Sequence, residues 1–289
     1  MEKINHFFEL TRLKRPIGYM LLFWPCIWGL TLAFDFSNNI QIYLKYFFLF
    51  LSGSILMRSA GCIINDIADK DFDKKVERTK KRPIASGKVS IKLGLLYSLI
   101  LCLVAFVVLL QFNLYTIILA LCSMPLAFSY PYMKRFTYWP QLFLGITFNY
   151  GLILGWTAIY SSVNVVPLIF YLGAIFWTLG YDTIYGYQDI KDDEIIGVKS
   201  TSIKFKNSPK LFIIICYSIF YISLIYIGFE MNFSNIYFFV LILIALHLFF
   251  FQIFQLKINS KKNCLKVFKS NNLLGFLVFI NLLIGKVII

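Results

Sequence analysis

The chain has 289 residues, of which 59% are hydrophobic and only 15% are charged. Soluble domains carry roughly 25% charged residues, and a soluble protein of this size could not bury so much apolar surface. The composition therefore excludes a soluble globular protein and indicates an integral membrane protein. The net charge of +14 does not require an anionic partner such as a nucleic acid, because membrane proteins with several cytoplasmic loops are basic for topological reasons.

Apolar residues come in blocks of about 17 to 25, which is long enough for a helix to cross the roughly 30 Å core of a bilayer. They predict an all-α, polytopic membrane protein with nine transmembrane helices. The first block has the basic flank of a signal peptide, but it is long and lacks an A-x-A-like cleavage site, so we expect a retained helix. The predicted spans are residues 17–34, 41–64, 91–111, 114–130, 141–160, 165–188, 209–229, 235–256 and 271–288.

The connections between these spans alternate in charge. Lys and Arg occur before the first span and after spans two, four, six and eight, whereas the intervening connections contain neither. The positive-inside rule then predicts a cytoplasmic N-terminus and an external C-terminus. The two longest cytoplasmic loops, about 65–90 and 189–208, are expected to carry the active site of a single domain that extends over residues 1–289.

Ten of the fourteen acidic residues gather in two clusters, which is not how a solubilising surface is distributed. Four predicted spans separate the clusters, an even number, so both clusters lie on the cytoplasmic side. They are far apart in sequence and are expected to be close in space. The clusters are Asp66, Asp69, Asp71, Asp73 and Glu77, and Asp182, Asp189, Asp192, Asp193 and Glu194.

The first cluster places its polar residues on one face of a helix. At about 100° per residue, Asn65, Asp66, Asp69 and Asp73 project within roughly a quadrant, while Asp71 points away. Carboxylates this close either raise one another's pKa or need a cation. Oxygen ligands without Cys or His suit Mg²⁺. The alternative interpretation is a solvated acidic helix end.

The second cluster has a similar geometry. Asp182, Asp189 and Asp193 lie close to one line along a helix, and the first segment repeats this spacing. Two facing sets of carboxylates predict a pair of Mg²⁺ ions that hold a diphosphate as a leaving group.

Basic residues accompany the acidic clusters on the same side of the membrane. Arg78 and Arg82 follow the first cluster, Lys134 and Arg135 follow the fourth span, and Lys199 follows the second cluster. Such cations can clamp phosphate oxygens. For each of them the alternative is that it serves only the positive-inside topology.

Arg58 lies inside the second span, about 10 Å deeper than Asn65. An arginine within a membrane segment is a functional-site hypothesis by default. We expect it to receive the carboxylate of an acceptor, with Asp182 orienting that acceptor or serving as a base. The alternative is a buried structural ion pair between Arg58 and Asp182.

Two segments carry a resemblance to a known family. Residues 65–73, NDIADKDFD, resemble the NDxxDxxxD motif of the UbiA superfamily of intramembrane prenyltransferases, and residues 189–193 resemble its second motif, DxxxD. The similarity covers about residues 10–205. Its flanking segments most resemble the branch that prenylates 4-hydroxybenzoate in ubiquinone biosynthesis, although Gly186 stands where related sequences often have Ala. These segments are Arg15–Gly18, Trp24-Pro25, Met57–Cys62, Arg82-Pro83, Tyr130-Pro131 and Tyr181–Thr201.

The resemblance implies nine helices around a central cavity and an active site on the cytoplasmic side. It implies polyprenyl diphosphate and 4-hydroxybenzoate as substrates, with transfer to the ring carbon ortho to the hydroxyl. It also implies the ligands of Mg²⁺, which are Asn65, Asp66, Asp69, Asp73, Asp189 and Asp193.

Two alternatives stay open at this point. One is a prenyltransferase with another acceptor, such as a naphthoate or heme, because relatives share the metal motifs. The other is a cation-coupled transporter, which predicts acids near the centres of spans and not at their cytoplasmic ends. The short N-terminus, without an Arg- and Ser-rich presequence, favours a bacterial inner membrane.

Overall fold

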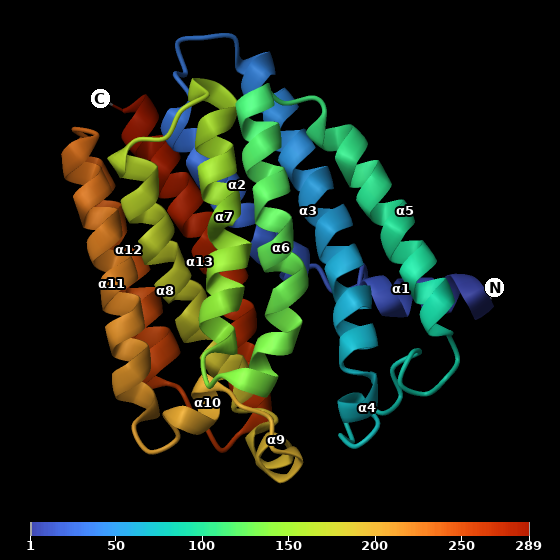
Figure 1. Ribbon diagram of the computed structural model, residues 1–289. Helices are drawn as coiled ribbons and strands as arrows, with labels where there is room; N and C mark the ends of the chain where they lie inside the picture. Colours follow the sequence, from blue (N-terminus) through green and yellow to red (C-terminus); the bar gives the residue numbers. More distant parts are fainter. Residues whose placement is uncertain (1, 289) are drawn as a thin grey trace.

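The computed structural model describes residues 2–288, and over this range the chain forms helices and no strand (Figure 1). The long helices run alongside one another as a bundle. They are α2 (Ile17–Ala33), α3 (Ile40–Ala68), α5 (Ile91–Leu109), α6 (Leu114–Phe136), α7 (Pro140–Tyr160), α8 (Val165–Gly186), α11 (Pro209–Glu230), α12 (Asn235–Ala245) continued by the π-helix η1 (Leu246–Phe254), and α13 (Lys261–Val287).

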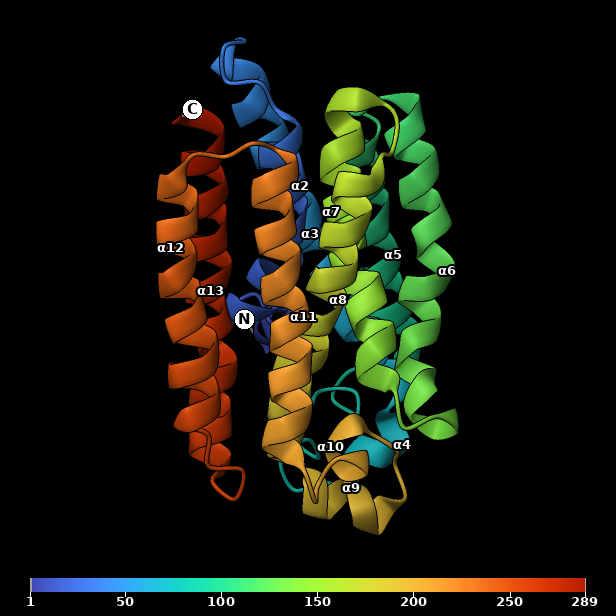
Figure 2. The ribbon, with the colours of Figure 1, turned by 90° about the vertical axis from the view of Figure 1, so that its left-hand side faces the viewer.

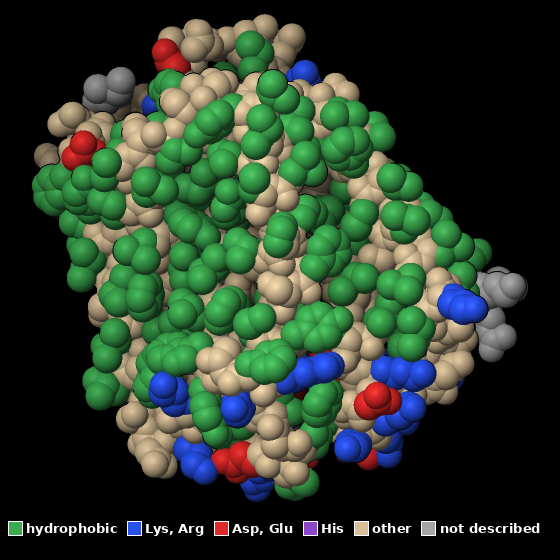
Figure 3. All heavy atoms as spheres, in the orientation of Figure 1, with side chains coloured by type: hydrophobic (Ala, Val, Ile, Leu, Met, Phe, Trp, Pro, Cys, Tyr) green, Lys and Arg blue, Asp and Glu red, His purple; other side chains and the backbone are tan. Residues whose placement is uncertain are grey.

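The prediction of an all-α polytopic membrane protein is confirmed. Within the described residues, eight helices are long and apolar enough to cross a membrane, and the shorter apolar helix α2 occupies the position of the first predicted span. Hydrophobic side chains cover most of the face in Figure 3, whereas Lys and Arg gather toward its lower end. This distribution is the one expected of a bundle surrounded by lipid along its length and by water at its basic end.

The largest differences from the predicted spans are at two helix boundaries. Helix α6 continues to Phe136, beyond the predicted end at residue 130, with Pro131 inside it. Helix α13 begins at Lys261, earlier than the predicted residue 271, because the Ser260 hydroxyl accepts a hydrogen bond from the Asn263 N–H and caps the helix. Both extensions lie at the basic end and are polar, so hydropathy alone did not detect them.

The centre of the bundle is held by close packing of α2, α7 and α8. Gly155 of α7 lies against the Cys26 carbonyl of α2, and a Cβ there would clash with it. The Trp28 ring stacks on Phe170 with centroids 5.5 Å apart and lies 5.0 Å from Trp177. Small residues that allow backbone approach, together with aromatic packing, are typical of helix interfaces in membranes.

Four short helices lie toward the basic end: α1 (Glu2–Thr11), α4 (Lys70–Asp73), α9 (Ile190–Ile196) and α10 (Thr201–Lys204). Figure 2 shows α4, α9 and α10 together at that end of the bundle. Helix α1 packs on α3, where Leu10 is fully buried with Ile63 and Ile84. The residues just after α1 are thereby held close to the end of α3.

Candidate active site

Three carboxylates of the first acidic segment are buried at the end of α3 and in α4. Asp66 is 2% exposed, Asp69 3% and Asp73 7%, whereas the side chain of Asp71 is 90% exposed. The regular helix is interrupted at Asp69, but the Asp73 N–H still donates to the Asp69 carbonyl at 2.8 Å. The turn therefore keeps its register, and the predicted separation of Asp71 from the other three carboxylates is confirmed.

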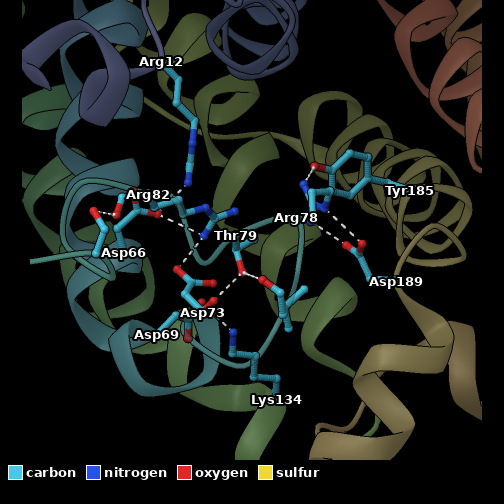
Figure 4. Close-up of polar contacts among 12 residues, drawn as sticks. Arg12, Asp66, Asp69, Asp73, Arg78, Thr79, Arg82, Lys134, Tyr185 and Asp189 are labelled. Atoms are coloured by element: carbon cyan, nitrogen blue, oxygen red, sulfur yellow. Dashed lines mark hydrogen bonds and ion pairs between the residues drawn. The ribbon is translucent and has the colours of Figure 1, made fainter. Parts of the chain in front are cut away.

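Cations from different parts of the chain reach these carboxylates (Figure 4). The Arg12 Nη2 donates to Asp66 Oδ1 at 2.5 Å. The Arg82 Nη1 donates to the same oxygen at 3.1 Å and to Asp73 Oδ2 at 2.8 Å. Asp66 and Asp73 are thus joined through one guanidinium, which offsets the cost of burying two like charges.

Asp69 is bound on one oxygen only. Lys134 Nζ lies 2.5 Å from Asp69 Oδ2, while Oδ1 is buried and has no hydrogen-bond partner among the described residues. Burial raises the pKa of the Asp69 carboxyl above its ordinary value, with Lys134 acting against the shift. A buried carboxylate oxygen without a donor is a position at which a further cation is favourable.

In the second acidic segment, one arginine binds Asp189. Arg78 donates from Nε to Asp189 Oδ1 at 2.9 Å and from Nη2 to Asp189 Oδ2, forming a bidentate pair. Its Nη1 also donates to the Tyr185 hydroxyl at 3.1 Å. Burial and the nearby charge of Asp189 raise the pKa of Asp193 to about 6, so a cation beside Asp193 would favour its ionised form.

One loop connects the two acidic segments. Arg82 and Arg78 both lie in the segment between α4 and α5, yet Arg82 binds the first acidic segment and Arg78 binds Asp189. Figure 4 shows these two arginines facing different groups across the site. The expectation that the clusters, although far apart in sequence, meet at one end of the bundle is confirmed.

The donor set fits a hard divalent cation. All candidate ligands offer oxygen, and Asp69 Oδ1 is without a partner. Within residues 2–288, no three acidic, His or Cys side chains converge as a complete protein cage would require. Mg²⁺ rarely needs such a cage, because it usually binds one or two carboxylates together with waters and substrate phosphates.

Arg58 remains unpaired inside the membrane segment of α3. The described residues contain no ion pair between Arg58 and Asp182, both of which are half-buried. The guanidinium lies over the Phe148 ring, 5.4 Å from its centroid, and its Nε is buried without a partner. Gly18 makes room for it, since a Cβ there would lie 2.9 Å from Nε. Arg58 therefore retains hydrogen-bonding capacity for an anionic group.

Two of the predicted phosphate-binding residues bond to backbone carbonyls. The Arg135 Nη2 donates to the Ala68 carbonyl at 2.6 Å, at the end of α3. Lys199 Nζ donates to the Phe136 carbonyl at 3.2 Å, at the end of α6. Both satisfy orphan carbonyls at helix C-termini, where cations are also favoured by the helix dipole.

Sequence reasoning did not select two of the site residues, Arg12 and Tyr185. Arg12 was counted only as a charge for topology, but it ends α1 in a left-handed conformation, with φ 55°, and turns its side chain toward Asp66. Nothing local marks either residue, because Arg12 is 54 positions from Asp66 and Tyr185 is 107 positions from Arg78. Left-handed backbone at a non-glycine residue is a signal that only the structure displays.

The fold and the site together define a polytopic helical membrane protein with an acidic and basic site at one end of its bundle. The sequence pattern of the UbiA prenyltransferase family matches residues 22–283, and the chain belongs to this family.

Curated relatives match nearly the whole chain. The mitochondrial 4-hydroxybenzoate polyprenyltransferase of Arabidopsis thaliana is 41% identical over 290 residues, which cover 99% of this chain and 70% of the relative. The 4-hydroxybenzoate octaprenyltransferase of Francisella tularensis subsp. novicida is 40% identical, with 96% of each chain covered.

Solved structures share the fold. A UbiA homologue from Aeropyrum pernix K1 superposes with a TM-score of 0.76 at 22% identity, covering 92% of this chain and 97% of its own. A homologue from Archaeoglobus fulgidus bound to GPP and Mg²⁺ gives a TM-score of 0.72 at 16% identity, covering 97% and 99%. At these identities the likeness supports the fold of the bundle.

Proposed function

We propose that this protein transfers a polyprenyl group from polyprenyl diphosphate to the ring carbon ortho to the hydroxyl of 4-hydroxybenzoate, in a Mg²⁺-dependent reaction of ubiquinone biosynthesis. The observation that carries the proposal is the pairing of two acidic segments at one end of the bundle with an unpaired arginine, Arg58, deeper in the membrane. The names of the plant and bacterial relatives, at about 40% identity, supply the acceptor.

The diphosphate is assigned to the outer part of the site. Bound Mg²⁺, for which we infer two ions, supplies charge stabilisation for the diphosphate leaving group. The ligands would be Asn65, Asp66, Asp69, Asp73, Asp189 and Asp193.

Four cations pair with these carboxylates and would donate to phosphate oxygens: Arg12, Arg78, Arg82 and Lys134. As donors already fixed around the site, they require little reorganisation when negative charge develops on the leaving group. Arg135 and Lys199 border the same site and would add positive potential.

The acceptor is assigned to the inner part of the site. Arg58 would hold its carboxylate through the guanidinium, which lies over the Phe148 ring. In the transfer, the allylic carbon–oxygen bond breaks, a carbon–carbon bond forms, and the ring proton leaves to the released diphosphate or to Asp182. A fixed carboxylate anchor determines which ring carbon meets the prenyl carbon.

We propose nine membrane spans with a cytoplasmic N-terminus and an active site that faces the cytoplasm. The gathering of Lys and Arg at the end that carries α4 and α9 supports this orientation (Figure 3). The bacterial relatives support an inner membrane location, whereas other relatives of similar identity are mitochondrial.

The test is a transfer assay with purified protein in detergent. Geranyl diphosphate and 4-hydroxybenzoate are incubated with Mg²⁺ or with EDTA, and the prenylated acid is measured by mass spectrometry. A product that requires Mg²⁺ supports the proposal. If folded protein gives no product with 4-hydroxybenzoate but does give one with a naphthoate or heme acceptor, the proposed acceptor is wrong and the proposed reaction class stands.

A further inference from the structure

Two buried threonine hydroxyls meet behind the second acidic segment. Thr183 of α8 and Thr201 of α10 are both fully buried, and their Oγ1 atoms lie 2.6 Å apart. Thr183 Oγ1 donates its only proton to the Leu179 carbonyl, also at 2.6 Å. The Thr201 hydroxyl must therefore donate to Thr183, because a hydroxyl has one proton to give.

Neighbouring bonds complete this contact. The Ser202 hydroxyl donates to the Thr183 carbonyl at 2.8 Å and satisfies one of the four orphan carbonyls at the end of α8. The Thr201 N–H donates to Gln141 Oε1 of α7 at 3.0 Å. Gly186 leaves room for Ser202, since a Cβ there would clash with Ser202 Oγ. We call Gln141, Thr183, Thr201 and Ser202 the hydroxyl clasp.

The clasp closes the loop that carries the second acidic segment. Asp189 and Asp193 lie between Thr183 and Thr201, and α9 within this loop contains no buried residue. The other ties of this loop to the rest of the chain include the Arg78 pair with Asp189 and the hydrogen bond from the Lys199 N–H to the Lys134 carbonyl. Buried residues of this loop lie near its two ends, as at Tyr187 and Ser200, so the position of α9 between them depends on how those ends are fixed.

We propose that the hydroxyl clasp positions Asp189 and Asp193 opposite the first acidic segment, and that its residues are positioning residues for the reaction proposed above. The side-chain hydrogen bonds of the clasp connect its members to one another and to the Leu179 carbonyl, and among the described residues none of them reaches an acidic residue of the site. Loss of the Thr183 hydroxyl leaves the buried Thr201 hydroxyl without an acceptor, and loss of the Thr201 hydroxyl removes the side-chain bond between α8 and α10. We expect each loss to favour opening of the loop by about tenfold.

The experiment uses Thr183→Val and Thr201→Val, which keep side-chain shape and remove one hydroxyl each. Hydrogen exchange of the full-length protein, followed by mass spectrometry of peptides from residues 187–200, should be about tenfold faster in both variants. The Mg²⁺ concentration for half-maximal transfer should rise by a similar factor, while the KM for 4-hydroxybenzoate stays constant. Thr183→Ser, which restores a hydroxyl, should return both values toward wild type.

Thr31→Val is the matched control. Thr31 is also fully buried, donates to the Ile27 carbonyl at 2.7 Å and meets the Tyr43 hydroxyl at 2.8 Å, but it lies at the opposite end of the bundle. It should lower overall stability without changing exchange in residues 187–200 or the Mg²⁺ dependence.

Unchanged local exchange in both clasp variants, or an equal effect from Thr31→Val, would overturn the proposal. Faster exchange with an unchanged Mg²⁺ dependence would mean that the clasp only stabilises the loop, and this result would also overturn the proposal. If the wild-type protein transfers no prenyl group to any acceptor, the proposed function fails, and the exchange comparison still decides whether the clasp orders the loop.

Discussion

The two acidic segments of the site are held in different ways. The first is buried and bound by cations from three separate parts of the chain, Arg12, Arg82 and Lys134. In the second, Asp189 is bound by one arginine, Arg78, which is 41% exposed, and helix α9, which follows Asp189, contains no buried residue. The first segment is therefore built into the bundle, whereas the second depends on how its loop is anchored. We call the buried, ion-paired first segment the rigid half of the site. We call the second segment, which lies on an anchored loop, the adjustable half.

The largest expected effect is in the rigid half. Asp69→Asn should lower the rate of prenyl transfer by about 10² to 10³-fold, because it removes charge where electrostatic stabilisation is concentrated. The rate is measured at saturating Mg²⁺ with geranyl diphosphate and 4-hydroxybenzoate. The matched control is Asp71→Asn. The Asp71 side chain is 90% exposed, so this substitution should change the rate by less than about twofold. Equal rates for the two variants would contradict the assignment of Asp69.

The contrast in burial predicts different costs in stability. Arg12→Ala should lower the free energy of unfolding by about 1–3 kcal/mol, because Asp66 is buried and keeps only Arg82 as a partner. Arg78→Ala removes an arginine that is 41% exposed and should cost less than Arg12→Ala, since water reaches this pair more easily. Thermal unfolding of both variants in one detergent compares them directly. A larger loss for Arg78→Ala would reverse the distinction between the rigid and the adjustable half.

A third prediction concerns the inner part of the site, which belongs to neither acidic segment. Arg58→Ala should raise the KM for 4-hydroxybenzoate by about tenfold or more, the loss expected for a hydrogen bond to a charged group. The KM for geranyl diphosphate should remain the same, since Arg58 lies deeper than the proposed diphosphate site. Steady-state kinetics with each substrate varied in turn separate the two values. An unchanged KM for the acceptor would reject Arg58 as its anchor.

The smallest effect is expected where a cation bonds to a carbonyl instead of a carboxylate. Lys199→Ala should change the rate by less than about threefold, because Lys199 donates to the Phe136 carbonyl and is half-exposed. Lys134→Ala should lower the rate by about tenfold or more, because Lys134 binds Asp69. The two rates are measured under the same conditions, and a greater loss at Lys199 would assign the phosphate contact to that residue instead.

Much of this arrangement was predictable from the sequence because it depends on short-range rules. Runs of apolar residues predicted the long helices, and the 100° helical step predicted that Asp71 points away from the other carboxylates of its segment. The contact of Arg12 with Asp66 was not predictable, because it depends on how α1 packs and on a left-handed residue at its end. The carbonyl bonds of Arg135 and Lys199 were missed for a related reason, since charge alone does not reveal which partner lies nearby.

The separation of paired residues along the chain has a consequence for biosynthesis. Arg12 precedes Asp66 by 54 residues, and Arg78 precedes Asp189 by 111. At a synthesis rate of 5–20 residues per second, each arginine is made about 3–22 s before its partner. Until helix α8 has entered the membrane, Arg78 has no carboxylate of the second segment to bind, and the charges at this end stay in water. The site can thus be completed only after helices α2 to α8 have been synthesised, while α11, α12 and α13 are still to follow.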